Sequence, residues 1–243
     1  MRLHPAALLS SLLLVGSLAH AAPIVFTSTS YTTFALADAG NASDGPFSQA
    51  GDASLLPLSS SASALGDDGD TASAVAFADT LFLTATSEAN AVASTAASTA
   101  IATFTGSFNA LPGLLNLSLA FDALIDSLGG GLAGNQLAVT LEVGGITLFS
   151  DLLSSSALID QSFLLASGGA GLFDLTLIGT AEAAAPGDYA FSLASVNASL
   201  DAVAVPEPGS VALLLAGMFG LGLMRRRLGR AGVQAASVVP TGI

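Results

Sequence analysis

The stretch LNLSLAFD, residues 115–122, carries the clearest structural signal in this chain of 243 residues. Its odd-numbered positions hold three leucines and a phenylalanine, whereas its even-numbered positions hold small or polar residues. Successive side chains of a β-strand point to opposite faces of the sheet, so this period of two predicts a strand with one buried face. The fold is therefore expected to rest on half-buried strands.

Similar alternation extends through residues 22–204. Residues 139–143 and 146–149 alternate around Gly144-Gly145, which predicts a hairpin because a tight turn requires positive φ. Further strands are predicted, two on clear alternation and three on weaker patterns, at residues 173–177, 189–193, 24–37, 75–86 and 102–108. Seven to ten short strands separated by Gly, Ser and Asp clusters predict an all-β fold, an antiparallel β-sandwich of jelly-roll-like type.

Three segments give a less definite pattern. Residues 85–103 are nearly all Ala, Ser and Thr, a composition that suits a strand, a helix or a flexible segment. A strand is favoured, because Ala89 and Ala91 alternate with Glu88 and Asn90. Residues 38–51 and 59–70 are predicted to be long loops.

Charge is distributed very unevenly. The chain has a formal charge of −13, with five arginines and no lysine, and residues 21–224 contain no basic side chain. All 18 carboxylates lie between Asp38 and Glu207. Such a surface repels phosphates and has no cations with which to release counterions, so nucleic acid is excluded as a partner.

The N-terminus predicts a secretory signal peptide over residues 1–21. Arg2 supplies the positive region, residues 6–18 the apolar core, and Ala19 and Ala21 the small residues of a signal peptidase site. The alternative, a first transmembrane helix, is disfavoured because the apolar run of about 13 residues is shorter than the roughly 18 to 20 needed to span a bilayer.

The C-terminal segment predicts an exposed motif followed by a membrane helix. Pro206 and Pro208 hold the backbone around Glu207 extended, because each ring fixes φ and disfavours helix in the residue before it. Residues 209–224 then form an apolar stretch long enough for a short transmembrane helix. Arg225, Arg226 and Arg227 mark its cytoplasmic end, which places the acidic domain outside.

This order of motif, apolar helix and arginine cluster over residues 205–227 resembles the PEP-CTERM sorting signal of Gram-negative bacteria. The resemblance implies an exosortase-like processing enzyme as partner, which recognises Pro206, Glu207 and Pro208, and removal of the helix. It also implies an association with exopolysaccharide and biofilm. It further implies export across the inner membrane, transient anchoring, and release to the cell surface or medium. Residues 228–243, expected to be a disordered cytoplasmic tail, depart from the family pattern. An ordinary tail anchor is the alternative.

The exported segment lacks the side chains of most catalytic centres. It contains no Cys, Lys or His, since both histidines precede residue 22. It therefore lacks the side chains that nucleophilic triads, Ser-Lys dyads and zinc, copper or haem sites usually need. A glycoside hydrolase needs only two carboxylates roughly 5 to 10 Å apart. Sugar sites also use aromatic platforms, however, and the chain has no Trp and only Tyr31 and Tyr189. No enzymatic activity is therefore expected.

Two other motifs suggest ligands. Gly129 to Gly134 match the spacing of a dinucleotide-binding loop, but a strand rather than a helix is predicted to follow, so a plain loop is favoured. Asp67, Asp68 and Asp70 could ligate Ca²⁺, a hard cation that takes clustered oxygens, although solvated acidic turns are common. Residues 38–44 are a second acidic turn of this kind.

Three functions follow from these observations. The first is a structural or adhesive protein of the cell surface or extracellular matrix. The alternative is a Ca²⁺-dependent polysaccharide-binding module that uses Asp67, Asp68 and Asp70. The third, less favoured, is a glycoside hydrolase that works with carboxylates alone.

Overall fold

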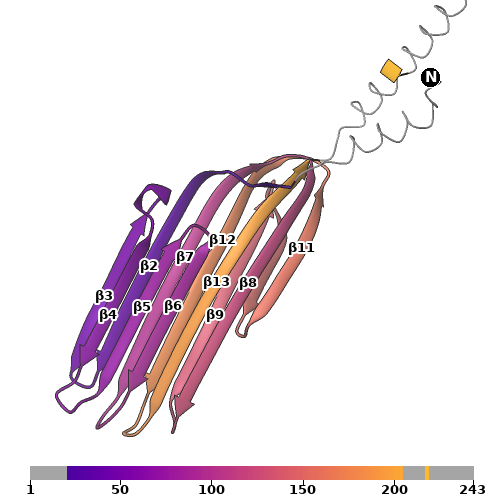
Figure 1. Cartoon of the computed structure of the whole chain (residues 1–243). Coiled ribbons are helices and arrows are strands. Elements are labelled where there is room, and N and C mark those ends of the chain that lie inside the picture. The colour runs from indigo at the N-terminus through magenta and orange to yellow at the C-terminus, as the bar shows by residue number, and fades with distance from the viewer. Residues whose placement is uncertain (1–20, 205–216, 219–243) are drawn as a thin grey trace, which may run out of the picture. The chain divides into compact units, whose positions relative to one another are not determined.

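Residues 21–204 of the computed structural model form thirteen strands and one short 3-10 helix (Figure 1). The structure describes these residues and 217–218. The predictions for Ala19, for the sorting motif Pro206 to Pro208 and for the arginines 225–227 concern residues outside the described ranges. Within 21–204 and 217–218, no helix has the length and apolar character of a membrane span.

The strands build two antiparallel sheets. The seven-stranded sheet has the order β11-β8-β13-β6-β5-β4, with β1 added to β13, and the six-stranded sheet has the order β10-β9-β12-β7-β2-β3. The seven-stranded sheet contains β1 (Ala22–Pro23), β4 (Leu58–Leu65), β5 (Thr71–Asp79), β6 (Phe82–Asn90), β8 (Gly113–Leu128), β11 (Ala157–Leu165) and β13 (Tyr189–Ala204). The six-stranded sheet contains β2 (Phe26–Ala39), β3 (Ala42–Gly51), β7 (Ala96–Ala110), β9 (Leu132–Val143), β10 (Ile146–Leu153) and β12 (Gly169–Ala183). The predicted antiparallel β-sandwich is confirmed.

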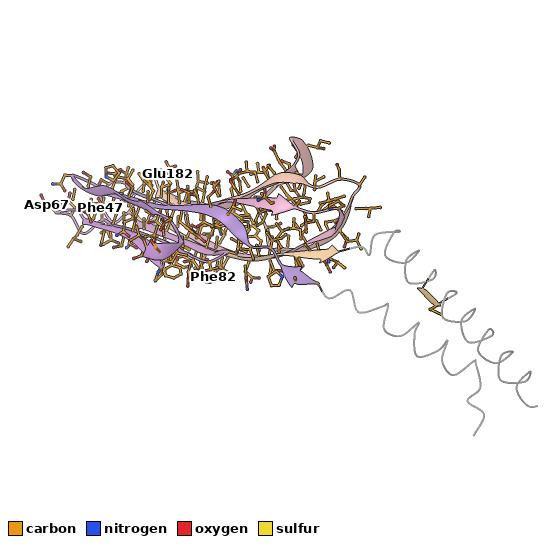
Figure 2. All side chains as sticks on the ribbon, turned by 90° about the horizontal axis from the view of Figure 1, so that it is seen from above. Phe47, Asp67, Phe82 and Glu182 are labelled. Atoms are coloured by element: carbon orange, nitrogen blue, oxygen red, sulfur yellow. The ribbon has the colours of Figure 1, made fainter. Side chains whose placement is uncertain are left out.

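The clearest sequence signals correspond to strands with one buried face. Residues 115–122 lie in β8, where Leu115, Leu117, Leu119 and Phe121 are each at most 1% exposed. Gly144 and Gly145 form the predicted hairpin between β9 and β10, with φ of 61° and 76°. Figure 2 shows the two layers with Phe82 and Glu182 on opposite outer sides.

The two predicted long loops are wrong. Most of residues 38–51 belong to β2 and β3, and most of residues 59–70 belong to β4. In β4 the inward positions include Ser60 rather than a large apolar residue, which hides the alternation. Ser60 is buried beside Thr33 of the other sheet, with 2.8 Å between their hydroxyl oxygens, and also donates to the Thr33 carbonyl at 3.2 Å. A hydrogen-bonded serine can therefore occupy a core position.

Two predicted continuous strands are interrupted. Residues 75–86 form a hairpin, β5 and β6, with a turn at Thr80-Leu81 that contains no glycine. Residues 85–103 are divided by a loop at 91–95, which separates β6 from β7. The cause of this second break is distant in sequence, because the Asp70 carboxylate accepts hydrogen bonds from three backbone amides of that loop.

The core differs along the sandwich. Alanines fill most of the interior where β4, β5 and β6 face β2 and the start of β7, whereas leucines and phenylalanines fill it around β8, β9 and the first half of β12. Small side chains allow the sheets to approach closely. A Cβ added to Gly179 of one sheet would lie 3.3 Å from the Ala85 carbonyl oxygen of the other.

Candidate functional site

An exposed group of aromatic and acidic side chains lies on the outer face of the seven-stranded sheet. In β13 the even-numbered Ala190, Ser192 and Ala194 face the core and are fully buried. Because side chains alternate along a strand, Tyr189 and Phe191 point outward, where both are partly exposed. The small side chains of residues 189–193 therefore face the core, and the large ones lie on the outer face of the sheet.

The strand register places two carboxylates beside Phe191. Phe191 pairs with Glu88 of β6 on one side and with Asp126 of β8 on the other. Directly opposite side chains on one face have Cβ atoms about 5 Å apart, so Glu88, Phe191 and Asp126 form a row. The next row holds Asn90, Tyr189 and Leu128. We call Glu88, Asp126, Tyr189 and Phe191 the aromatic–acidic face.

Apolar side chains extend this face. Leu193 pairs with Leu124, and their side chains are 39% and 56% exposed. Farther along the same outer surface, the rings of Phe77 and Phe82 pack at 6.3 Å in an edge-to-face arrangement. The sheet therefore presents apolar area together with carboxylate acceptors.

The electrostatics of the aromatic–acidic face favour a protonated phenol. Burial raises the pKa of Tyr189 above its ordinary value of 10, and the negative charges of Glu88 and Asp126 and a hydrogen bond with Glu88 raise it further. The phenol is therefore a hydrogen-bond donor at every physiological pH. Residues 21–204 contain no Lys or Arg, so no side-chain ammonium or guanidinium neutralises the two carboxylates there.

This arrangement suits a ligand rich in hydroxyl groups. Aromatic and leucine side chains can pack against the C–H face of a sugar ring, while carboxylates accept hydrogen bonds from its hydroxyls. Glu88 and Asp126 lie on strands separated by β13 alone, which corresponds to about 10 Å across the sheet at the usual strand spacing. The face is broad enough to meet more than one ring.

The three predicted calcium ligands differ in their surroundings. Asp70 is 1% exposed and turns inward, where Oδ1 accepts from the amides of Val92 at 2.6 Å and Ala93 at 2.8 Å. Oδ1 also accepts from the amide of Ser94, and Oδ2 from its hydroxyl. Asp67 and Asp68 are exposed. Across 21–204 and 217–218, no three acidic or histidine side chains lie close enough together to hold a metal ion.

The second acidic turn is also held by local hydrogen bonds. The side-chain amide of Asn41 donates to Asp67 at 2.6 Å and its oxygen accepts from the Asp67 backbone at 3.1 Å. The Asp44 carboxylate accepts from the backbone amide of Ser63 at 2.8 Å. The Asn41–Asp67 contacts join two turns, and the Asp44–Ser63 contact joins β3 of one sheet to β4 of the other.

The first half of the glycine-rich segment is a strand connection, whereas residues 132–134 already belong to β9. Residues 129–131 join β8 to β9, and the amide of Gly130 donates to the Asp188 carboxylate at 2.7 Å. A strand, β9, follows directly, so the helix that a dinucleotide site requires is absent at this position. Of the two tyrosines, Tyr31 is buried in the core at 1% exposure, and only Tyr189 reaches the surface.

Sequence reasoning missed Phe191, Glu88 and Asp126. The alternation of residues 189–193 predicts a strand, but by the rule that holds for residues 115–122 it would place Phe191 on the buried face. The structure buries Ala190, Ser192 and Ala194 instead, so the outward orientation of Phe191 was not predictable from the pattern. Glu88 and Asp126 lie about 100 and 65 residues before Phe191, and nothing local indicates that their strands flank β13.

No family model and no curated protein matches this chain. Among solved structures, TmCBM61 in complex with β-1,4-galactotriose has a TM-score of 0.25 and 10% identity, covering 60% of this chain and 88% of that one. The VP2 subviral particle of infectious bursal disease virus has a TM-score of 0.17 and 12% identity, covering 91% of this chain and 81% of that one. These TM-scores are too low for either likeness to indicate a shared function.

Proposed function

We propose that the sandwich is a non-catalytic domain that binds a neutral polysaccharide through the aromatic–acidic face. The observation that carries the proposal is the placement of Tyr189 and Phe191 on the outer surface, with Glu88 and Asp126 directly beside Phe191. Aromatic rings next to hydrogen-bonding groups provide stacking and orientation for a sugar chain without a deep pocket.

The charge of the domain supports a neutral polymer. An acidic polysaccharide would meet repulsion from a surface on which residues 21–204 offer no basic side chain. A neutral chain avoids this repulsion, and its hydroxyl groups can donate to the carboxylates. Binding does not require Ca²⁺ in this proposal, since the Asp70 carboxylate is engaged by backbone amides.

The proposed binding domain is delivered outside the cell. The terminal signals predict signal peptidase cleavage after Ala21, anchoring by a helix over 209–224, and exosortase-type processing near Pro206, Glu207 and Pro208. In this proposal the sandwich is of jelly-roll-like type, the helix over 209–224 anchors the protein in the membrane, and the exported domain acts in the matrix or biofilm. Binding of exopolysaccharide by the exported domain would give it the adhesive role expected from the sequence.

Glycan arrays test the binding claim. Full-length protein in a detergent without a sugar headgroup should bind at least one neutral polysaccharide. Phe191→Ala should weaken that binding about tenfold or more, as does the loss of an aromatic anchor that the bound partner covers. Phe47→Ala is the matched control, because Phe47 is 47% exposed on β3 of the other sheet. Addition of EDTA should leave the affinity unchanged.

Three results would count against this function. Equal weakening by Phe47→Ala and Phe191→Ala would remove the aromatic–acidic face as the site. If no glycan binds saturably, the structural role becomes the better proposal. Release of new reducing ends from a bound polymer would favour the glycoside hydrolase.

Cell fractionation tests delivery. Replacement of Pro206, Glu207 and Pro208 by Ala should hold the protein in the membrane, and mass spectrometry of the released wild type should show no peptide containing Arg225 to Arg230. Unchanged release of the variant would refute sorting through this motif.

A further inference from the structure

A second candidate site lies where the edge of β9 has no strand beside it. β10 pairs with β9 from Val143 only as far as Leu137, and the chain leaves this edge after Leu153. Residues 133–136 of β9 pair with β12 on their other side, so this stretch of the β9 edge has no strand partner on the β10 side, and the Gly134 carbonyl accepts from the Thr180 hydroxyl at 3.4 Å. Unpaired strand edges are hydrogen-bonding surfaces.

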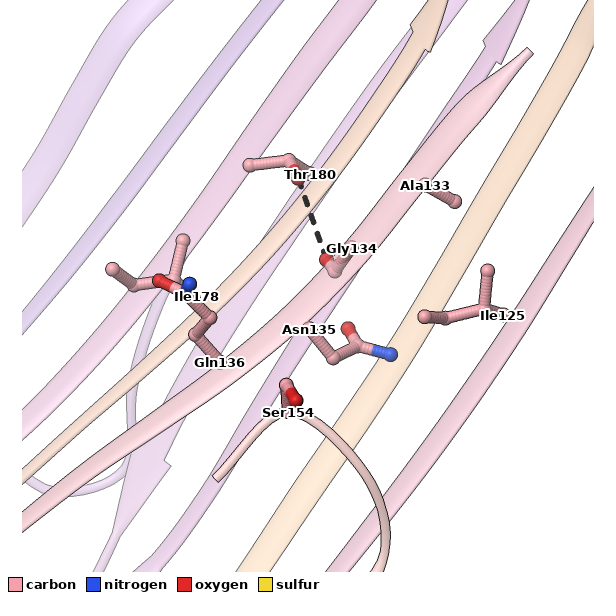
Figure 3. Close-up of a pocket in the computed structure, with 8 residues that line it drawn as sticks. All are labelled: Ile125, Ala133, Gly134, Asn135, Gln136, Ser154, Ile178 and Thr180. Carbon is pink, nitrogen blue, oxygen red and sulfur yellow. Dashed lines mark hydrogen bonds between the residues drawn. The ribbon is translucent and has the colours of Figure 1, made fainter. Parts of the chain in front are cut away.

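A pocket of about 400 Å³ occupies this position (Figure 3). Its walls include residues 133–136, two isoleucines, Ile125 and Ile178, and the hydroxyls of Ser154 and Thr180. All eight lining residues are uncharged, although the domain is strongly acidic. Pockets for small molecules typically begin at roughly 300 Å³ and combine apolar walls with a few polar groups.

Asn135 supplies a second, independent observation. It is 2% exposed, and its side-chain amide donates to the carbonyls of Leu124 at 3.0 Å and Leu193 at 3.1 Å in the facing sheet. Its Oδ1 has no hydrogen-bond partner within the described part of the chain. A buried acceptor without a donor is costly unless water or a ligand supplies the donor.

We infer that this pocket binds a small neutral polyol of one or two sugar rings, such as the end or a side branch of a polysaccharide. A ligand hydroxyl can donate to an edge carbonyl and accept from an edge amide, while the isoleucines contact its C–H groups. Asn135 Oδ1 has almost no exposed surface, so it accepts from the ligand only when its side chain turns toward the pocket. The sugar class rests on the proposed function, but the site is separate. Gln136, Ile178 and Thr180 point outward from the six-stranded sheet, opposite the aromatic–acidic face.

The side-chain amide of Asn135 gives a direct readout. Full-length ¹⁵N-labelled protein in a zwitterionic detergent is titrated with glucose, galactose, mannose, N-acetylglucosamine and their β-linked disaccharides, and the Asn135 signal is assigned by its loss in Asn135→Asp. At least one sugar should shift this signal saturably. Ser154→Tyr should lower the affinity at least tenfold by filling the pocket, whereas Ser155→Tyr, next in the same connection and outside the lining, should not.

The outcomes separate this site from the proposed function. Phe191→Ala should leave the Asn135 response intact, and Ser154→Tyr should leave binding at the aromatic–acidic face intact. Thr180→Phe, on the exposed side of β12, blocks the pocket from its other wall if Ser154→Tyr does not fold. No saturable shift with any sugar, or wild-type affinity in both blocked variants, would overturn the inference and leave water as the donor to Asn135.

Discussion

At the scale of single residues, backbone amides replace cations as the partners of buried carboxylates. Asp70 accepts from three amides of the loop 91–95, and Asp188 accepts from Gly130 at 2.7 Å and Ala185 at 3.0 Å. In a domain without Lys or Arg, this is how an acidic side chain can be buried, since hydrogen bonds to the charged form offset its desolvation. Both aspartates fix loops that join distant strands.

Asp70→Asn should destabilise the fold in a pH-dependent way. Hydrogen bonds from the Ser94 hydroxyl and the loop amides lower the pKa of Asp70 from 3.8 to about 2. The folded state therefore favours the charged form, so this stabilisation is complete above about pH 4 and is lost as the pH falls toward 2. Near neutral pH we expect a melting temperature lower by roughly 5 °C.

Thermal melts of wild type and variant between pH 2 and 7 measure this effect. The difference between them should shrink as the pH falls below 4. Asp68→Asn, at an exposed position of the same turn, is the control and should change little. A constant difference across the whole pH range would show that the charge of Asp70 is unimportant.

At the scale of elements, the turns decide how close neighbouring strands come. The β8–β9 connection passes so near the start of β13 that a Cβ on Gly131 would lie 2.0 Å from the Tyr189 carbonyl oxygen. The β9–β10 hairpin differs, because a Cβ on Gly144 would meet open space and only its φ of 61° favours glycine. Two glycines of the same fold are thus required for different reasons.

Gly131→Ala should be much more disruptive than Gly144→Ala. The first forces backbone apart and should lower the free energy of unfolding by about 2 kcal/mol or more, whereas the second adds only left-handed strain of about 1 kcal/mol. Urea unfolding measures both. Because Gly131 abuts Tyr189, the first variant should also weaken polysaccharide binding. Equal losses of stability would mean that the close approach relaxes easily.

At the scale of the whole molecule, the net charge is the dominant feature. All carboxylates except Glu207 lie within residues 21–204, where no Lys or Arg is present. Mutual repulsion among exposed carboxylates opposes the compact state, and salt screens it over a Debye length of about 10 Å at 0.1 M. Stability should therefore depend on ionic strength more than on any specific ion.

Raising NaCl from 0.01 M to 0.5 M at pH 7 should increase the melting temperature by several degrees, because screening weakens the repulsion. The increase should shrink near pH 4, where the carboxylates begin to titrate. CaCl₂ at matched ionic strength serves as the control. A larger stabilisation by CaCl₂ would reveal a calcium site, since a ligand of the folded state raises its melting temperature.

The sequence by itself determined the fold class, the strongest strands and the absence of basic side chains from residues 21–224. Periodicity of two is a local property, so residues 115–122, 139–149, 173–177 and 189–193 were predictable without knowledge of their partners. Strands β3 and β4 were not predictable in this way. β3 is an edge strand with no buried residue, and in β4 the inward Ser60, Ala62 and Ala64 weaken the alternation. The burial of β4 depends on neighbours in the other sheet, as Ser60 depends on Thr33.

Only the tertiary structure decided which side chains meet. In the sequence Asp70 belongs to an acidic cluster, whereas in the structure its carboxylate accepts hydrogen bonds from the loop 91–95, more than 20 residues away. Glu88 and Asp126 became neighbours of Phe191 because β6 and β8 flank β13, an arrangement set by the packing of two sheets. The physical reason is that strand order and register arise from long-range pairing and shared core volume, which no local window of sequence contains.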